Sequence, residues 1–89
     1  MRLRSRDVLI EFLDGAGLSE RELARRAGLS HSTVNHLLTG RRRGCSLSTA
    51  LAIERALDAP PGAVFRPDTD NEQNLLVQYA ESVRPSRRH

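Results

Sequence analysis

The fold is decided by residues 18–40, which read LSERELARRAGLSHSTVNHLLTG. Ser19 and Glu22 form a capping-box pattern, in which each side chain can accept a hydrogen bond from the backbone amide of the other residue. We therefore predict that a short helix begins directly after Ser19. Gly28 ends this helix, because glycine readily adopts the left-handed backbone conformation that closes a helix.

A second short helix is predicted over residues 31–39, with Ser30 as its N-terminal cap and Gly40 as its end. Two helices joined by so short a turn must cross at a steep angle. This crossing needs a small residue where the helices touch, a glycine in the turn, an apolar residue just after it, and apolar residues that face back from the second helix. These positions hold, in order, Ala24, Gly28, Leu29, Val34 and Leu37.

The outward face of the second helix carries only hydrogen-bonding side chains without a fixed charge. At ~100° per residue these side chains share an arc of about 140°, opposite the apolar residues. They are His31, Ser32, Asn35, His36 and Thr39. Side chains of this kind suit the reading of base edges in the major groove of DNA.

Three arginines, Arg41, Arg42 and Arg43, follow the second helix directly. A guanidinium group fits phosphate oxygens with two parallel hydrogen bonds. Phosphate contacts orient a protein on a duplex without reading its sequence. We expect these arginines to hold the DNA backbone; the alternative is a solvated loop.

These features resemble the lambda repressor/Cro-type helix-turn-helix family, most clearly over residues 18–40 and more loosely over residues 5–65. The resemblance rests on the pattern Leu-Ala-x-x-x-Gly-x-Ser at residues 23–30 and on the later run Ile-x-x-Ala-Leu…Val-Phe. It implies a bundle of five helices, major-groove binding by the third helix, and dimers that bind inverted-repeat operators.

By position, the resemblance implies base contacts at the start of the third helix and backbone contacts at its end. The predicted base-contacting residues are His31, Ser32, Asn35 and His36. The predicted phosphate-contacting residues are Ser19, Thr33, Thr39, Arg41, Arg42 and Arg43. The sequence departs from the family at Glu20, where a glutamine that touches DNA is common. Because a carboxylate repels phosphate and could contact only a cytosine amine, Glu20 is not among the predicted contacts.

The rest of the chain also shows helical periodicity, so the predicted class is all-α: a compact five-helix bundle followed by a C-terminal amphipathic helix. We expect a first helix after Ser5, a fourth over residues 47–58, a short fifth helical turn at residues 63–65, and a last helix over residues 70–83. Residues 1–66 form the predicted DNA-binding domain, and residues 67–89 form the C-terminal helix and a basic tail. Residues 84–89 are expected to be disordered. The arginines at positions 2, 4 and 6 form either an arm on DNA or a frayed end.

The last helix carries an apolar stripe that packs on the chain's own core or on a partner. Because the core is complete by Phe65, we favour a homodimer through Leu75, Leu76, Tyr79 and Val83. The predicted function is a sequence-specific regulator that binds double-stranded DNA, a repressor of phage or mobile-element type. The alternative is an antitoxin whose last helix binds a toxin while its helix pair regulates its own gene.

Composition narrows the function classes. A length of 89 residues favours one domain, and 14 basic against 11 acidic residues, a net charge of +3, suit a polyanionic partner. No apolar run approaches the ~18 residues of a membrane span and no signal peptide is evident, so we expect a cytoplasmic protein without membrane association. Cys45, the only cysteine, predicts neither a disulfide nor a zinc site. No arrangement of catalytic residues is evident, so we expect neither an enzyme nor a cofactor.

Overall fold

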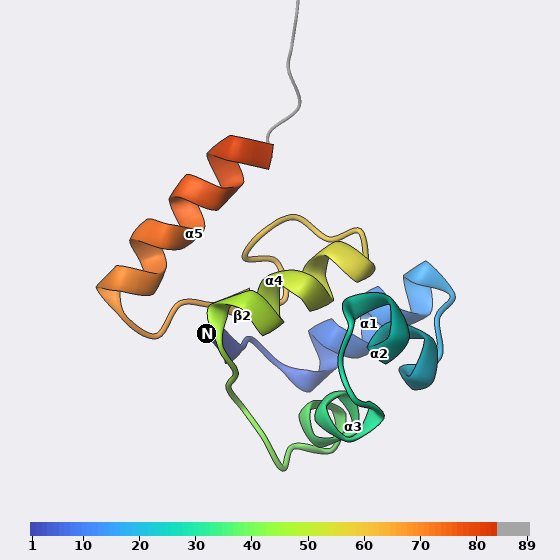
Figure 1. Cartoon of the computed structure of the whole chain (residues 1–89). Coiled ribbons are helices and arrows are strands. Elements are labelled where there is room, and N and C mark those ends of the chain that lie inside the picture. Colours follow the sequence, from blue (N-terminus) through green and yellow to red (C-terminus); the bar gives the residue numbers. More distant parts are fainter. Residues whose placement is uncertain (84–89) are drawn as a thin grey trace, which may run out of the picture.

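The computed structural model describes residues 1–83 (Figure 1). This part of the chain contains five α-helices and one small two-stranded sheet. In chain order the elements are β1 (Arg2–Leu3), α1 (Arg6–Ala16), α2 (Glu20–Ala27), α3 (His31–Thr39), α4 (Leu47–Ala56), β2 (Phe65–Arg66) and α5 (Asp70–Val83). The predicted all-α class is confirmed, with a minor β component. The predicted disordered tail, residues 84–89, and the side chain of Val83 lie outside the described residues.

Serine caps set the starts of the first four helices. In each case the serine side chain accepts a hydrogen bond from the backbone amide three residues further on; the caps are Ser5, Ser19, Ser30 and Ser46. The capping box is complete, because Ser19 Oγ accepts from the amide of Glu22 at 3.1 Å and Glu22 Oε1 accepts from the amide of Ser19 at 3.1 Å. Gly28 ends α2 in the left-handed conformation, with φ of 72°. The predicted bounds of α2 and α3 are confirmed.

The core lies where α2 packs against α3 and α4, with α1 against α3. Each of these helices contributes large apolar side chains that are fully buried, among them Leu9, Leu23, Leu37 and Ile53. Full burial of such a side chain stabilises the fold by ~1.5–3 kcal/mol. Ala24, the small residue predicted at the helix contact, is also buried. The helix pair is therefore held at its crossing angle by the side chains that the sequence pattern indicated.

The segment after α4 forms turns and bends until β2 begins at Phe65, so the predicted helical turn at residues 63–65 is wrong. α4 itself ends at Ala56, two residues before the predicted end, and Asp58 adopts a left-handed φ of 59°. The physical reason is Glu54, whose side chain is only 1% exposed. Its carboxylate accepts hydrogen bonds at 3.0–3.1 Å from the amides of Gly62, Val64 and Phe65. Amides held by a side chain in this way are not available for the bonds of a helix.

The first residues of the chain are ordered, so the alternative of a frayed basic terminus is wrong. β1 pairs antiparallel with β2, with Leu3 opposite Phe65. On its other side β1 lies along the loop that follows α3, where the amide of Leu3 donates to the carbonyl of Arg43 at 2.8 Å. Met1 is buried.

Helix α5 has the predicted bounds and lies outside the group formed by α1–α4 (Figure 1). It is fixed near its N-terminal end, where the Glu72 carboxylate accepts hydrogen bonds from the N-terminal amine at 2.7 and 2.8 Å. Leu76, 9% exposed, packs within the chain's own core, whereas Leu75 and Val77 are 40% and 45% exposed. None of the helices in residues 1–83 is long and apolar enough to cross a membrane.

Candidate nucleic-acid interface

Helix α3 turns one polar face outward. Val34 and Leu37 are fully buried and fix the opposite face against the core. On the outward side His31 and Ser32 are exposed, while Asn35 and His36 are half-buried. The structure thus brings all four predicted base-contacting residues onto one helix.

Glu20, which is not among the predicted contacts, lies beside this face. Its Oε1 atom accepts a hydrogen bond from Asn35 Nδ2 at 3.2 Å and lies 3.2 Å from His31 Nε2. The carboxylate therefore joins the first residue of α2 to two side chains of α3. The position of Glu20 in the sequence was the signal that could have indicated this contact, because Glu20 is the first residue of α2 and His31 is the first residue of α3.

The predicted phosphate-contacting residues lie around the ends of α2 and α3. Ser19 is exposed at the N-terminal cap of α2, and Thr39 is exposed at the end of α3. Thr33 is half-buried, and its hydroxyl lies 2.9 Å from Ser30 Oγ. The arginines at positions 41–43 are all exposed. A hydroxyl that accepts from an amide can still donate its own proton, so the cap at Ser19 leaves its O–H available to an anion.

A hollow of about 660 Å³ lies between β1, the start of α1, the end of α3 and β2. Six arginines line it: Arg2, Arg4, Arg6, Arg42, Arg43 and Arg66. We call this hollow the arginine groove. Arg2 is neutralised in part by Asp68, with Nε and Oδ1 3.0 Å apart, and Arg4 donates to the carbonyl of Gly62 at 2.7 Å. The other four form no ion pair with an acidic side chain of residues 1–83. Such a concentration of positive charge in a hollow attracts polyanions.

The strand β1 builds this groove from parts that are distant in the sequence. The loop after α3 is fixed by the hydrogen bond from the Leu3 amide to the Arg43 carbonyl and by the hydrogen bond from the Cys45 amide to the Met1 carbonyl, at 2.9 Å. The pairing of β1 with β2 brings Arg66 to the same place. Arg66 was not predicted and the role of the N-terminal arginines stayed open, because strands of two residues have no periodicity to detect.

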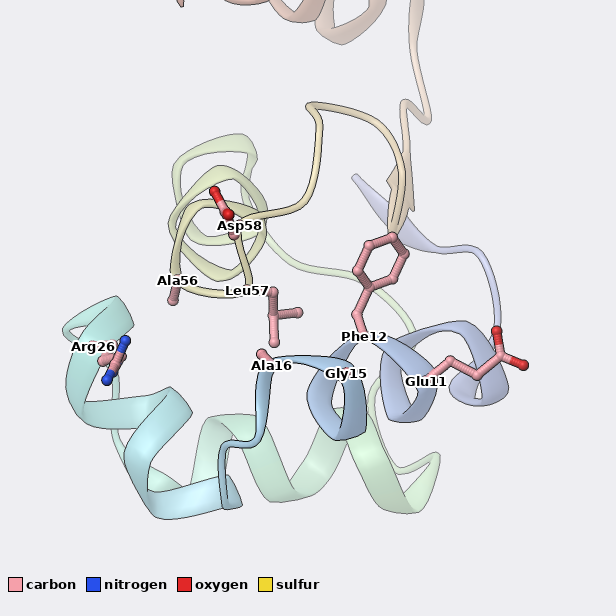
Figure 2. Close-up of a pocket in the computed structure, with 8 residues that line it drawn as sticks. All are labelled: Glu11, Phe12, Gly15, Ala16, Arg26, Ala56, Leu57 and Asp58. Carbon is pink, nitrogen blue, oxygen red and sulfur yellow. The ribbon is translucent and has the colours of Figure 1, made fainter.

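A second hollow, of about 610 Å³, lies where the C-terminal ends of α1, α2 and α4 meet (Figure 2). Phe12 and Leu57 supply its apolar surface, and Figure 2 shows Glu11 and Arg26 on opposite sides of it. None of the predicted contact residues lines this hollow. In the described part of the chain, no three His, Cys, Asp or Glu side chains gather as a metal site requires.

Residues 2–65 match the model of a protein family described as a helix-turn-helix domain. The match covers more than half of the chain. It includes α1–α4 and every predicted contact residue of α3 and its loop, and it ends before α5. No curated protein and no solved structure matches the chain significantly.

Proposed function

The chain belongs to the helix-turn-helix domain family, and we propose that it is a sequence-specific transcriptional regulator of the lambda repressor/Cro type that binds double-stranded DNA. The observation that carries this proposal is the outward face of α3, where hydrogen-bonding side chains stand beside the arginine groove. Side chains of the first kind read base edges in the major groove. Guanidinium groups bind the phosphates and set the orientation of the protein.

In this proposal α3 enters the major groove with its N-terminal half against the bases. The base contacts are assigned to His31, Ser32, Asn35 and His36. The phosphate contacts are assigned to Ser19, Thr33, Thr39, Arg41, Arg42 and Arg43. The exposure of α3 and of the loop after it supports this assignment, and the groove adds Arg6 and Arg66 to the phosphate contacts.

We propose further that residues 1–66 form the DNA-binding domain and that residues 67–89 serve assembly. The exposed Leu75 and the half-buried Tyr79 support a homodimer through α5, to which the sequence pattern adds Val83. Leu76 acts from inside the chain, because it packs on the chain's own core and holds α5 in place. A twofold dimer binds an inverted repeat. Occupation of such an operator represses transcription, in the manner of a phage or mobile-element repressor.

A second candidate function is that of an antitoxin. The observation that favours it is the position of α5 outside the other helices, with Leu75 and Val77 exposed. In this case the apolar side of α5 binds a toxin, and the helix pair binds and regulates the operon that encodes both proteins. A toxin gene next to the coding sequence distinguishes this candidate from the first.

The test is selection of binding sites from a randomised duplex library with the purified protein, followed by a salt titration on the enriched sequence. We expect an inverted repeat with half-sites ~10 bp apart and an affinity that falls steeply with salt. Replacement of Ser32 or His36 by alanine changes the enriched bases, whereas Arg55→Gln on α4, outside the groove, does not. If no sequence is enriched, the proposal fails.

A further inference from the structure

One carboxylate holds two of the side chains that are proposed to read bases. Glu20 Oε1 lies 3.2 Å from both His31 Nε2 and Asn35 Nδ2. His31 and Asn35 are one turn apart on α3, whereas Glu20 comes from α2. No other hydrogen bond joins Glu20 to a side chain in residues 1–83.

The chemistry of a carboxylate fixes the direction of the hydrogen bond between Glu20 and Asn35. An ionised carboxylate carries no proton, so it accepts hydrogen bonds and cannot donate them. Asn35 must therefore turn its Nδ2 group toward Glu20, which leaves Oδ1, an acceptor, free for another partner. His31 Nε2 lies 3.2 Å from the same oxygen, so Glu20 also fixes the place of the imidazole. Glu20 thus leaves Asn35 with a free acceptor, beside an imidazole that the same carboxylate contacts.

We propose that Glu20 is a specificity-determining residue, which acts by positioning His31 and Asn35 so that the N-terminal half of α3 selects adenine or cytosine. In the major groove the amino groups are adenine N6 and cytosine N4. Guanine and thymine present acceptors, O6 and O4, in place of an amino group, and these oppose the acceptor of Asn35. The inference rests on the proposed function, because it names the bases that the same helix selects.

The experiment compares sites selected from the randomised library by the wild type, Glu20→Gln and Glu11→Gln. Glu11 is exposed on α1, so its variant changes the net charge equally and serves as the matched control. A glutamine side chain can donate to Asn35 Oδ1 and so lets the amide turn its Nδ2 group outward. We expect Glu20→Gln to lose the discrimination against guanine and thymine at one half-site position by ~5-fold or more, with the rest of the site unchanged. Glu11→Gln selects the wild-type site.

A double-mutant cycle with Asn35→Ala tests whether Glu20 acts through Asn35. If it does, the losses from Glu20→Gln and Asn35→Ala at that position do not add. Thermal unfolding of each variant shows that it is folded. An unchanged preference in Glu20→Gln, or strictly additive losses, overturns the inference and leaves the proposed function standing.

A measurement without DNA separates the two failures further. In ¹⁵N–¹H spectra of the free protein, the side-chain amide signals of Asn35 shift in Glu20→Gln and stay in place in Glu11→Gln. If they do not shift, Glu20 does not hold Asn35 and the inference is wrong, whatever DNA the protein selects. If the signals shift but the wild type selects no sequence, the proposed function fails and takes the assignment of bases with it.

Discussion

Ser19 shows how a single hydroxyl fixes the start of a helix. Its Oγ atom accepts from the amide of Glu22, and the Glu22 side chain binds the amide of Ser19 in return. Replacement of Ser19 by alanine leaves an amide of α2 without its partner, so we expect a loss of ~1 kcal/mol in the free energy of unfolding. The melting temperature, followed by circular dichroism, falls by ~4–8 °C.

The control for this prediction is Ser32→Ala. Ser32 is exposed within α3, and alanine is the better helix former there. We expect Ser32→Ala to keep the wild-type melting temperature while it changes DNA selection. An equal loss of stability in both variants would contradict the role of Ser19.

Cys45 is a structural residue. It is half-buried in the loop between α3 and α4, and burial raises the pKa of its thiol to about 11. Because the thiolate is the reactive form, we expect slow reaction of the native protein with a disulfide reagent at pH 8. The rate rises when the chain is unfolded in urea. A native rate equal to the unfolded rate would point to a reactive thiol instead.

At the scale of elements, Glu54 determines the path from α4 to β2. Replacement by alanine removes the acceptor of three buried or half-buried amides, and we expect a loss on the order of 3 kcal/mol in the free energy of unfolding. Glu54→Gln loses less, because its side-chain carbonyl still accepts. Urea unfolding of the two variants and the wild type measures the difference. If glutamine and alanine are equally destabilising, the hydrogen bonds are not the cause.

Two acidic residues connect α5 and the segment before it to the N-terminal end of the chain. The hydrogen bond from the N-terminal amine lowers the pKa of Glu72, and the hydrogen bond from Arg2 lowers the pKa of Asp68. A carboxylate whose pKa is lower in the folded state stabilises the fold above its unfolded pKa, and this stability is lost as the pH falls. We therefore expect the melting temperature to fall as the pH drops below about 4.5.

The matched variants for this titration are Glu72→Gln and Glu81→Gln. Glu72→Gln starts from a lower melting temperature at pH 7 and loses less between pH 4.5 and pH 3. Glu81 is exposed on α5, and its variant follows the wild type. If the melting temperature of all three proteins depends on pH in the same way, the hydrogen bonds of Glu72 contribute nothing to stability.

The elements that could be predicted are those with local signals. The bounds of α2 and α3 follow from a serine at the start and a glycine at the end. The helical turn expected at residues 63–65 failed because the side chain that prevents it, Glu54, lies about ten positions away and looks like any other polar residue of a helix. The pairing of β1 with β2 depends on Leu3 meeting Phe65, a contact that no local pattern can indicate.

For the whole molecule, the candidate interface likewise contains parts with a local sequence signal and parts without one. The outward polar face of α3 followed from helical periodicity, whereas the position of Glu20 and the arginine groove depend on contacts between elements. Four arginines of the groove, unpaired within residues 1–83, are available for phosphates. The groove therefore predicts how DNA affinity depends on salt.

We expect Arg42→Gln and Arg66→Gln each to lower the slope of log affinity against log salt by ~1, because each removes one phosphate contact. Affinity falls to a similar degree on all sequences, since phosphate contacts carry no sequence information. Arg55→Gln keeps the wild-type slope. An unchanged slope in Arg66→Gln would remove β2 from the interface.

The pairing of β1 with β2 also has a kinetic consequence. The contacts of α2 with α3 join residues that are close in the chain, so they form at a small cost in loop entropy. The pairing of Leu3 with Phe65 closes nearly the whole domain into one loop, and closure of a long loop costs more entropy and slows folding. We therefore expect the helix pair to assemble first and the arginine groove last. Thermal fluctuations would open the two strands before they disturb the helices, so the outward face of α3 would outlast the arginine groove.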